Sequence, residues 1–191
     1  MKRLYYHKTR NDVVGFKLKV KQRLENLPDK KVIRVLDAFA GEHKIWNEII
    51  KLKPEIEFKI VYLEKIKGLH EDNVEGVNLY YLQRNDLSQF DVIDLDHYSF
   101  AYEQLVEIFE QNYKGTVFFT FIQAGLGSLN KSMLNYLFGS PEISNKCRTM
   151  YSKDGFEIAL KFFWKKGIKE VNYQKLNTVG CRKYYGQFTT K

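Results

Sequence analysis

A regular alternation between short apolar segments and amphipathic segments is the feature of this 191-residue chain that most limits its fold. Apolar segments rich in β-branched or aromatic residues predict strands at 31–37, 58–64, 77–83, 90–96 and 115–122. Helical spacing of apolar residues predicts helices at 13–26, 44–53, 101–113, 128–138 and 155–167. Strands that alternate with helices form a mostly parallel sheet, which helices cover on both faces.

The end of the chain departs from this alternation. Segments 169–177 and 182–190 are both strand-like, and only a short turn with Gly180 separates them, so they must pair as an antiparallel hairpin. The predicted fold is therefore α/β: a Rossmann-like, mostly parallel seven-stranded sheet with helices on both faces and a terminal antiparallel β-hairpin. The length suits one domain over residues 1–191, in which residues 1–30 form a basic N-terminal helical extension.

Composition excludes several classes of protein. Apolar residues make up 44% and charged residues 28% of the chain, as in a globular protein. No segment approaches the roughly 20 apolar residues that span a bilayer, and the charged first residues have no apolar region after them, so we expect a cytoplasmic protein. Cys147 and Cys181 have no CxxC partner, which predicts neither a disulfide framework nor a metal site.

The net charge of +8 is concentrated at the two ends of the chain. Residues 1–34 contain 11 Lys or Arg and 3 Asp or Glu, residues 161–191 contain 8 and 1, and the middle contains 12 and 19. Basic margins with interleaved tyrosines fit a partner such as RNA or DNA, because lysine and arginine displace counterions from phosphates and aromatic rings stack on bases. Solvated helix and strand faces would give the same pattern.

The candidate ligand residues end strands, because ligands of open parallel sheets lie beyond the carboxyl ends of the strands. Gly41 lets the backbone approach a ligand, and Asp37 could orient a ligand ammonium group. Glu64 follows Gly41 by 23 residues, a spacing that suits an acid on ribose hydroxyls. Asp86 could accept from an adenine amino group. Acidic residues at strand ends are also common where they only meet solvent.

Three segments resemble class I S-adenosylmethionine-dependent methyltransferases. "VLDAFAG" (35–41) resembles their motif I, notably the DxFAGxG form of enzymes that act on nucleic acids, and "YLEK" (62–65) resembles the acidic end of their second strand. "FDVIDLDHYSF" (90–100) is similar to motif IV, in particular to the DxDPFG form of tRNA (guanine-N2) dimethyltransferases. The terminal hairpin is also typical of the family. The resemblance implies that S-adenosylmethionine is bound by Asp37, Phe39, Gly41, Glu64 and Asp86, and that the methyl acceptor faces Asp94, Asp96, His97 and Tyr98.

Two residues depart from the family pattern. His43 replaces the second glycine of motif I, and His97 replaces the proline of motif IV. The expected chemistry is hydrogen bonding of a base amino group by Asp94 or Asp96, with Tyr98 stacked on the base. His97 is either a proton acceptor or a hydrogen-bonding surface residue.

The sequence therefore predicts an S-adenosylmethionine-dependent methyltransferase that acts on an amino group of a base in RNA or DNA. A 5-methylcytosine mechanism is excluded because no cysteine follows the fourth strand. The alternative is a non-catalytic nucleic-acid- or partner-binding module with a degenerate methyltransferase fold. A nicotinamide-dependent oxidoreductase is disfavoured by the absence of GxGxxG after the first strand.

Overall fold

A computed structural model describes residues 13–64, 73–75, 78–124, 129–139 and 148–190; Tyr5, Tyr6 and Cys147 lie outside them. Its strands are β1 (Val32–Asp37), β2 (Glu57–Glu64), β3 (Asn73–Glu75), β4 (Val92–Leu95), β5 (Gly115–Ala124), β6 (Asn172–Thr178) and β7 (Cys181–Thr190). Its helices are α1 (Val13–Glu25), α2 (Lys44–Leu52), α3 (Asn78–Arg84), the 3-10 turn η1 (Leu87–Gln89), α4 (Tyr102–Glu110), α5 (Lys131–Phe138) and α7 (Arg148–Lys165).

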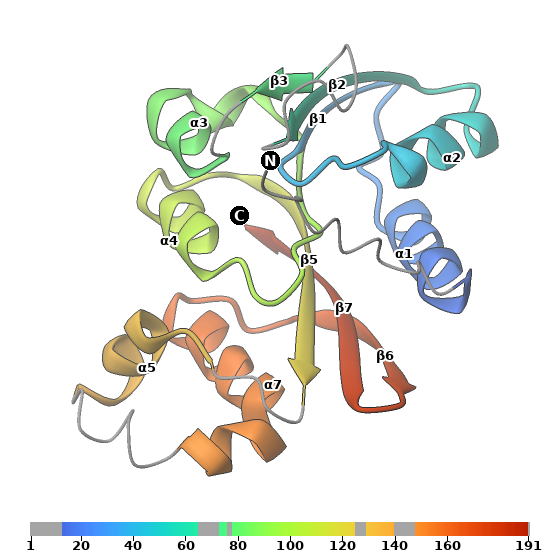
Figure 1. Ribbon diagram of the computed structural model, residues 1–191. Helices are drawn as coiled ribbons and strands as arrows, with labels where there is room; N and C mark the ends of the chain where they lie inside the picture. Colours follow the sequence, from blue (N-terminus) through green and yellow to red (C-terminus); the bar gives the residue numbers. More distant parts are fainter. Residues whose placement is uncertain (1–12, 65–72, 76–77, 125–128, 140–147, 191) are drawn as a thin grey trace, which may run out of the picture.

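The strands form one sheet in the order β3-β2-β1-β4-β5-β7-β6 (Figure 1). β1 to β5 are parallel, whereas β7 is antiparallel to both β5 and β6. The strand order reverses between β1 and β4, the position where open parallel sheets bind ligands beyond the carboxyl ends of their strands. Asp37 and Asp94 are register partners at this point.

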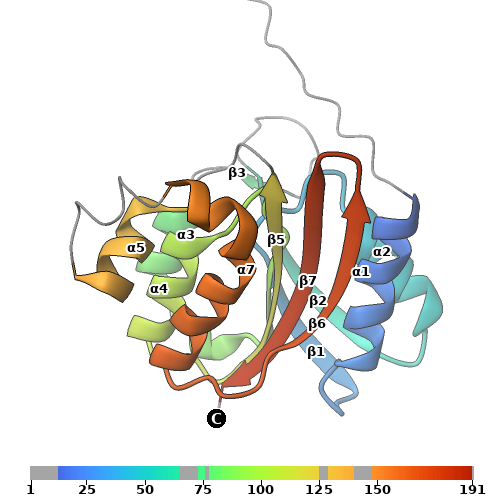
Figure 2. The same ribbon diagram turned by 90° about the horizontal axis from the view of Figure 1, so that it is seen from below.

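Helices cover both faces of the sheet (Figure 2). α1 and α2 pack on one face, where Val20 and Trp46 join a cluster with Ile33 and Phe118 of the sheet. α3, α4, α5 and α7 cover the other face over a larger core rich in phenylalanine. None of the described helices combines the length and apolar character needed to cross a membrane.

The mostly parallel sheet, the two helical layers and the terminal hairpin agree with the sequence prediction, but one predicted strand is wrong. Residues 77–83 were expected to be the third strand, and residues 78–84 instead form α3, while β3 is a three-residue strand before it. Helix α3 buries Leu82 completely and leaves Tyr80 59% exposed. A short apolar and aromatic segment does not distinguish a strand from a helix by periodicity alone.

Helix α1 is part of the domain and not an extension from it. Gln22 and Arg23 are 2% and 1% exposed, and Gln22 Nε2 donates to the carbonyl of Tyr185 on β7 at 2.6 Å. The helix therefore closes the sheet face over β6 and β7.

Gly186 allows close packing between β5 and β7. It pairs with Phe119, and a β-carbon at position 186 would overlap the phenyl ring of Phe119. That ring is 1% exposed and packs against Phe163 and Phe188. It has no room to move, because well-packed interiors contain few voids.

We therefore expect Gly186→Ala to lower the free energy of unfolding by about 1–3 kcal/mol, the usual cost of overpacking a core. Gly155→Ala is the matched control: its β-carbon would lie 3.5 Å from Phe121 and Gln123, an ordinary contact, within α7. Helix propensity favours alanine there by up to about 1 kcal/mol. Urea unfolding followed by circular dichroism measures both; equal effects of the two variants would contradict the packing argument.

Candidate functional site

The glycine turn after β1 is attached to the end of β2. Gly41 has a φ of 51°, and its N–H donates to Glu64 Oε2 at 3.0 Å. The N–H of Ala40 donates to the carbonyl of Leu63 at 3.1 Å. A β-carbon at Gly41 would meet nothing within 4 Å, so the turn presents open backbone beside an acid. The structure therefore brings Gly41 and Glu64 together, and their role in binding a cofactor stays a prediction.

His43 preserves the turn although it replaces a glycine. It takes the left-handed conformation, with φ 58° and ψ 13°, which costs a side chain roughly 1–2 kcal/mol. Its ring is 3% exposed and stacks on Tyr62 of β2, with ring centroids 3.7 Å apart and planes within 5°. Burial and stacking offset the backbone strain, and the imidazole is packed inside the protein.

Asp94 at the end of β4 is enclosed by helices and does not face an acceptor. Its carboxylate is 1% exposed and takes two hydrogen bonds from Arg23, Nε to Oδ2 at 2.7 Å and NH2 to Oδ1 at 2.6 Å. Trp46 Nε1 of α2 also donates to Oδ2, at 3.0 Å. The expected contact between Asp94 and the acceptor is corrected accordingly: Asp94 holds α1 and α2 against the sheet.

Both carboxylate oxygens of Asp96 are also bound by side chains of the protein. Oδ2 pairs with Lys19 at 2.6 Å, and Oδ1 accepts from the Thr120 hydroxyl at 2.6 Å. Burial raises the pKa of Asp96, but the charges of Lys19 and Arg23 and the two hydrogen bonds outweigh it, so the pKa lies below its ordinary value. Asp96 is therefore an ionised anchor for α1 and a poor proton acceptor.

Asp37 lacks such a cation of its own. It is 5% exposed, and Oδ1 accepts from the Phe39 N–H at 3.3 Å. Burial, followed by the nearby charges of Asp94 and Asp96, raises the pKa of Asp37 well above its ordinary value; the Phe39 hydrogen bond and Arg23 oppose this less strongly. Three carboxyl groups and two cations thus lie together at the ends of β1 and β4. Asp37 is the carboxyl group without an ion pair, and its pKa is the one that rises.

His97 and Tyr98 lie on the exposed loop after β4. The Ser99 N–H donates to His97 Nδ1 at 3.2 Å, which makes Nδ1 an acceptor and Nε2 the protonated nitrogen of the neutral ring. Burial lowers the pKa of His97 despite the opposing charge of Asp96. The neutral ring, which lies 4.7 Å from the ring of Phe39, therefore suits hydrogen-bond donation better than proton acceptance. Tyr98 is 61% exposed and available for stacking.

Asp86 lies at the opposite edge of the sheet. Because residues 78–84 form a helix, Asp86 follows the end of α3, caps η1 by accepting from the Ser88 N–H at 2.9 Å, and precedes the amino end of β4. The expected adenine contact is therefore corrected. Asn78, at the start of α3, lies at the carboxyl edge instead and donates to the carbonyl of Ala38 at 2.9 Å. Sequence pattern does not indicate this position for Asn78, because a strand over 77–83 would place it in the middle of the strand.

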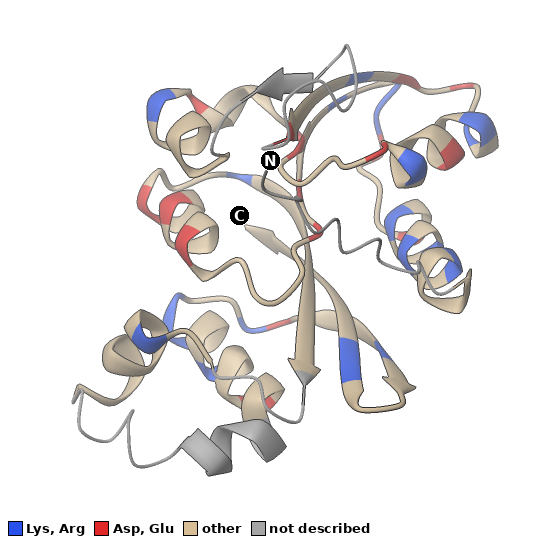
Figure 3. Ribbon diagram, in the orientation of Figure 1, with Lys and Arg blue, Asp and Glu red and all other residues tan. Residues whose placement is uncertain are grey.

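Charged residues are spread over both sides of the sheet, with Lys or Arg also on α3, α5 and α7 (Figure 3). Basic residues lie on α1 and on the β6–β7 hairpin, and acidic residues lie along α4. Lys19 and Arg23 of α1 form ion pairs inside the protein, whereas Lys17 and Lys21 of the same helix are exposed. The described residues contain no group of His, Cys, Asp and Glu arranged to hold a metal ion.

The sequence matches no protein-family model and has no significant match among curated proteins. Its structure is similar to a precorrin-6y C5,15-methyltransferase from Geobacter metallireducens, with a TM-score of 0.56, 11% identity, and coverage of 97% of this chain and 92% of that one. A SAM-dependent methyltransferase from Archaeoglobus fulgidus matches with a TM-score of 0.50, 14% identity, and coverage of 91% and 94%. The fold is that of S-adenosylmethionine-dependent methyltransferases.

A third similar structure is a phosphoethanolamine N-methyltransferase 2 from Haemonchus contortus in complex with phosphomonomethylethanolamine and S-adenosylhomocysteine. Its TM-score is 0.52 and its identity 12%, and the match covers 92% of this chain and 53% of that one. At these identities the likeness is one of fold. None of these matches supports the specific resemblance of residues 90–100 to tRNA (guanine-N2) dimethyltransferases.

The buried ion pair makes a first prediction for this site. Arg23→Met leaves the Asp94 carboxylate buried without its cation, which costs about 3–5 kcal/mol of unfolding free energy. Arg23→Met with Asp94→Asn removes both charges and keeps an oxygen for Trp46, so we expect the double variant to be more stable than Arg23→Met alone. Lys21→Met on the exposed side of α1 should change stability by less than about 0.5 kcal/mol. Strict additivity of the two single substitutions in urea unfolding would contradict the pairing.

Asp37 makes a second prediction. A raised folded-state pKa means that the native protein gains stability from the protonated carboxyl at low pH and loses it as the pH rises from the ordinary value of 3.8 through the raised one. Asp37→Asn should therefore be more stable than the wild type at pH 8, with a smaller advantage at pH 4.5. The control is Asp29→Asn, at an exposed position. A pH-independent difference in unfolding free energy for Asp37→Asn would refute the assignment.

Proposed function

We propose that this protein is an S-adenosylmethionine-dependent methyltransferase. The observation that carries the proposal is the hydrogen bond at 3.0 Å between the open glycine turn at Gly41 and the carboxylate of Glu64, on a methyltransferase strand order. A carboxylate accepts about four hydrogen bonds, so the bond from Gly41 is compatible with binding of ribose hydroxyls. The structures of similar fold whose names state S-adenosylmethionine dependence or a bound S-adenosylhomocysteine support the choice of cofactor.

The residues at the carboxyl edge fit this cofactor. Glu64 would hold the ribose, the backbone at Gly41 would lie against the amino-acid part, and Asp37 would orient the ammonium group. Phe39 is partly buried beside His97 and would cover the reacting end of the cofactor. The cofactor supplies an activated methyl group: the acceptor atom bonds to the methyl carbon as the carbon–sulfur bond breaks, the electron pair stays on sulfur, and the acceptor loses a proton.

The acceptor that we propose is an amino group of a base in RNA or DNA. Tyr98, exposed at the end of β4, would stack on the base, and His97 would donate a hydrogen bond from Nε2. Alignment of the amine with the methyl group is the main contribution that the protein can make to an in-line displacement. Because Asp94 and Asp96 are engaged by α1, the proton of the amine would leave to solvent.

A second candidate is a binding module that retains the fold without activity. The observation in its favour is that Arg23, Lys19 and Thr120 occupy the carboxylates of Asp94 and Asp96, the acids expected to face the acceptor. Transfer of a radiolabelled methyl group to RNA, DNA and free nucleotides separates the two candidates. Binding of S-adenosylhomocysteine without transfer to any acceptor would favour the inactive module.

Calorimetric titration tests the cofactor site. We expect the wild type to bind S-adenosylmethionine and S-adenosylhomocysteine but not NAD. Glu64→Ala should weaken binding at least tenfold, because hydrogen bonds to a charged group contribute about 1.5–3 kcal/mol each. Glu57→Ala, on the same strand but at its exposed amino end, is the matched control and should leave affinity unchanged. A folded wild type that binds neither compound would overturn the proposed function.

A further inference from the structure

A cavity opens at the carboxyl edge of the sheet, beside β5 and the β6–β7 hairpin. Its volume is about 400 Å³, which lies within the range of roughly 300–1,000 Å³ for small-molecule sites. The lining residues are Gln123, Lys175, Asn177, Thr178, Gly180, Cys181 and Arg182. They include two cations and no acid, so the lining is positively charged. None of these residues belongs to the glycine turn or to the loop after β4.

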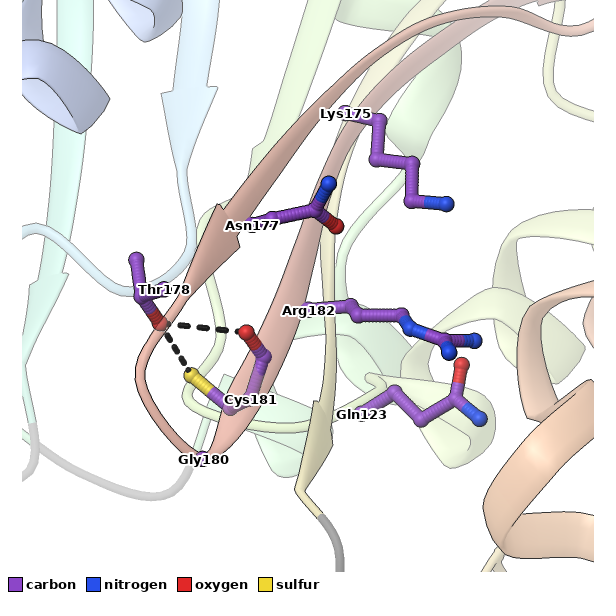
Figure 4. Close-up of a pocket in the computed structure, with 7 residues that line it drawn as sticks. All are labelled: Gln123, Lys175, Asn177, Thr178, Gly180, Cys181 and Arg182. Carbon is purple, nitrogen blue, oxygen red and sulfur yellow. Dashed lines mark hydrogen bonds between the residues drawn. The ribbon is translucent and has the colours of Figure 1, made fainter.

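The side chains of four lining residues come from three neighbouring strands and point to the same side of the sheet, toward α7 (Figure 4): Gln123, Lys175, Asn177 and Arg182. Gln123 on β5 is the register partner of Arg182 on β7, and Arg182 is the partner of Asn177 on β6. This row of three crosses the sheet, and Lys175 lies two residues from Asn177 on the same face. Pairing of the strands therefore sets the spacing of the cations and amides.

Tyr184 positions both cations. Its ring is 3% exposed, and Lys175 Nζ lies 5.7 Å from the ring centroid. Burial and Glu157 raise the pKa of the Tyr184 hydroxyl, while a hydrogen bond with Arg182 opposes the shift. The ring thus contacts the ammonium group and the hydroxyl bonds the guanidinium group, which restricts where each can lie and lowers the entropic cost of binding an anion between them.

A backbone hydrogen bond connects the cavity to the loop that bears Tyr98. The N–H of Ile122 donates to the carbonyl of Ser99 at 3.0 Å, and Gln123 is the next residue of β5. The β6–β7 turn lies at the same edge of the sheet, because Cys181 pairs with Ala124, the last residue of β5. A backbone hydrogen bond therefore joins the strand that lines the cavity to the loop that bears Tyr98.

We propose that this cavity binds a phosphate-bearing nucleotide unit of the methyl acceptor. Lysine and arginine are the residues that pair with phosphate oxygens, and the amides of Asn177 and Gln123 have the donors and acceptors that bind base edges or ribose hydroxyls. The volume exceeds what a phosphate ion alone requires and suits a nucleotide. The inference rests on the proposed methyltransferase function and adds the site that would hold the phosphate of the acceptor.

The test uses the whole protein and calorimetric titration with AMP, GMP, CMP and UMP, with the matching nucleosides, and with inorganic phosphate. At least one nucleotide should bind at least tenfold more tightly than its nucleoside and than inorganic phosphate, with an affinity that falls as salt rises. Lys175→Gln and Arg182→Gln should each weaken nucleotide binding about tenfold. Deoxynucleotides form a further arm that separates RNA from DNA acceptors.

Lys183→Gln is the matched control. Lys183 adjoins Arg182 on β7 but projects to the other face, so its loss removes the same charge without touching the cavity. The proposal is overturned if Lys183→Gln weakens binding as much as Arg182→Gln, if nucleosides bind as well as nucleotides, or if no nucleotide binds. Titration of S-adenosylhomocysteine into the same variants should give unchanged affinity. Nucleotide binding without cofactor binding would refute only the methyltransferase function, and the reverse would refute only the nucleotide site.

Discussion

The ion pair between Arg23 and Asp94 is the interaction on which the carboxyl edge depends. Both side chains are 1% exposed, and the two residues lie 71 positions apart in the chain. Such a pair is tolerable only when geometry and additional hydrogen bonds compensate for the lost hydration. The bidentate contact and the indole N–H of Trp46 provide that compensation. α1, α2 and β4 are thereby held by one carboxylate, directly beneath the residues that would bind ligands.

The same cluster explains why the charge of Asp37 is not balanced as those of Asp94 and Asp96 are. Lys19 pairs with Asp96 and Arg23 pairs with Asp94. Neither of these two cations forms an ion pair with Asp37. The resulting repulsion favours the protonated form of Asp37, which is the direction of its pKa shift. A cationic ligand group at that position would replace the proton, and the binding energy would then include relief of an unfavourable charge arrangement. A cost of this kind in the free protein is common at ligand sites.

The sequence was informative where local pattern determines structure. Six of the seven predicted strands, the turn at Gly41 and its acidic partner Glu64 all follow from periodicity and spacing. The prediction was wrong at 77–83, a short segment that fits the periods of both a strand and a helix. Because of that error, Asp86 was expected at the carboxyl edge of the sheet and lies at the opposite edge. The prediction was also wrong for α1, because a count of basic residues does not reveal that Lys19 and Arg23 point inward toward acids more than 70 residues away. The cavity beside the hairpin depends on three strands in register, which no single segment encodes.

The carboxyl edge divides into two halves that share β4 and its following loop. Gly41 and Glu64 occupy the β1–β2 half, and Lys175 and Arg182 occupy the β5–β7–β6 half. A displacement reaction requires reacting atoms about 3–3.5 Å apart and in line, so two ligands must be fixed on one rigid support. The hydrogen bond from Ile122 to Ser99 joins the loop with His97 and Tyr98 to β5, and the bond from Ala38 to the Asp94 carbonyl joins β4 to the glycine turn. The residues between the two halves are therefore held by backbone hydrogen bonds, and the acids expected to perform chemistry serve instead to keep that support in place.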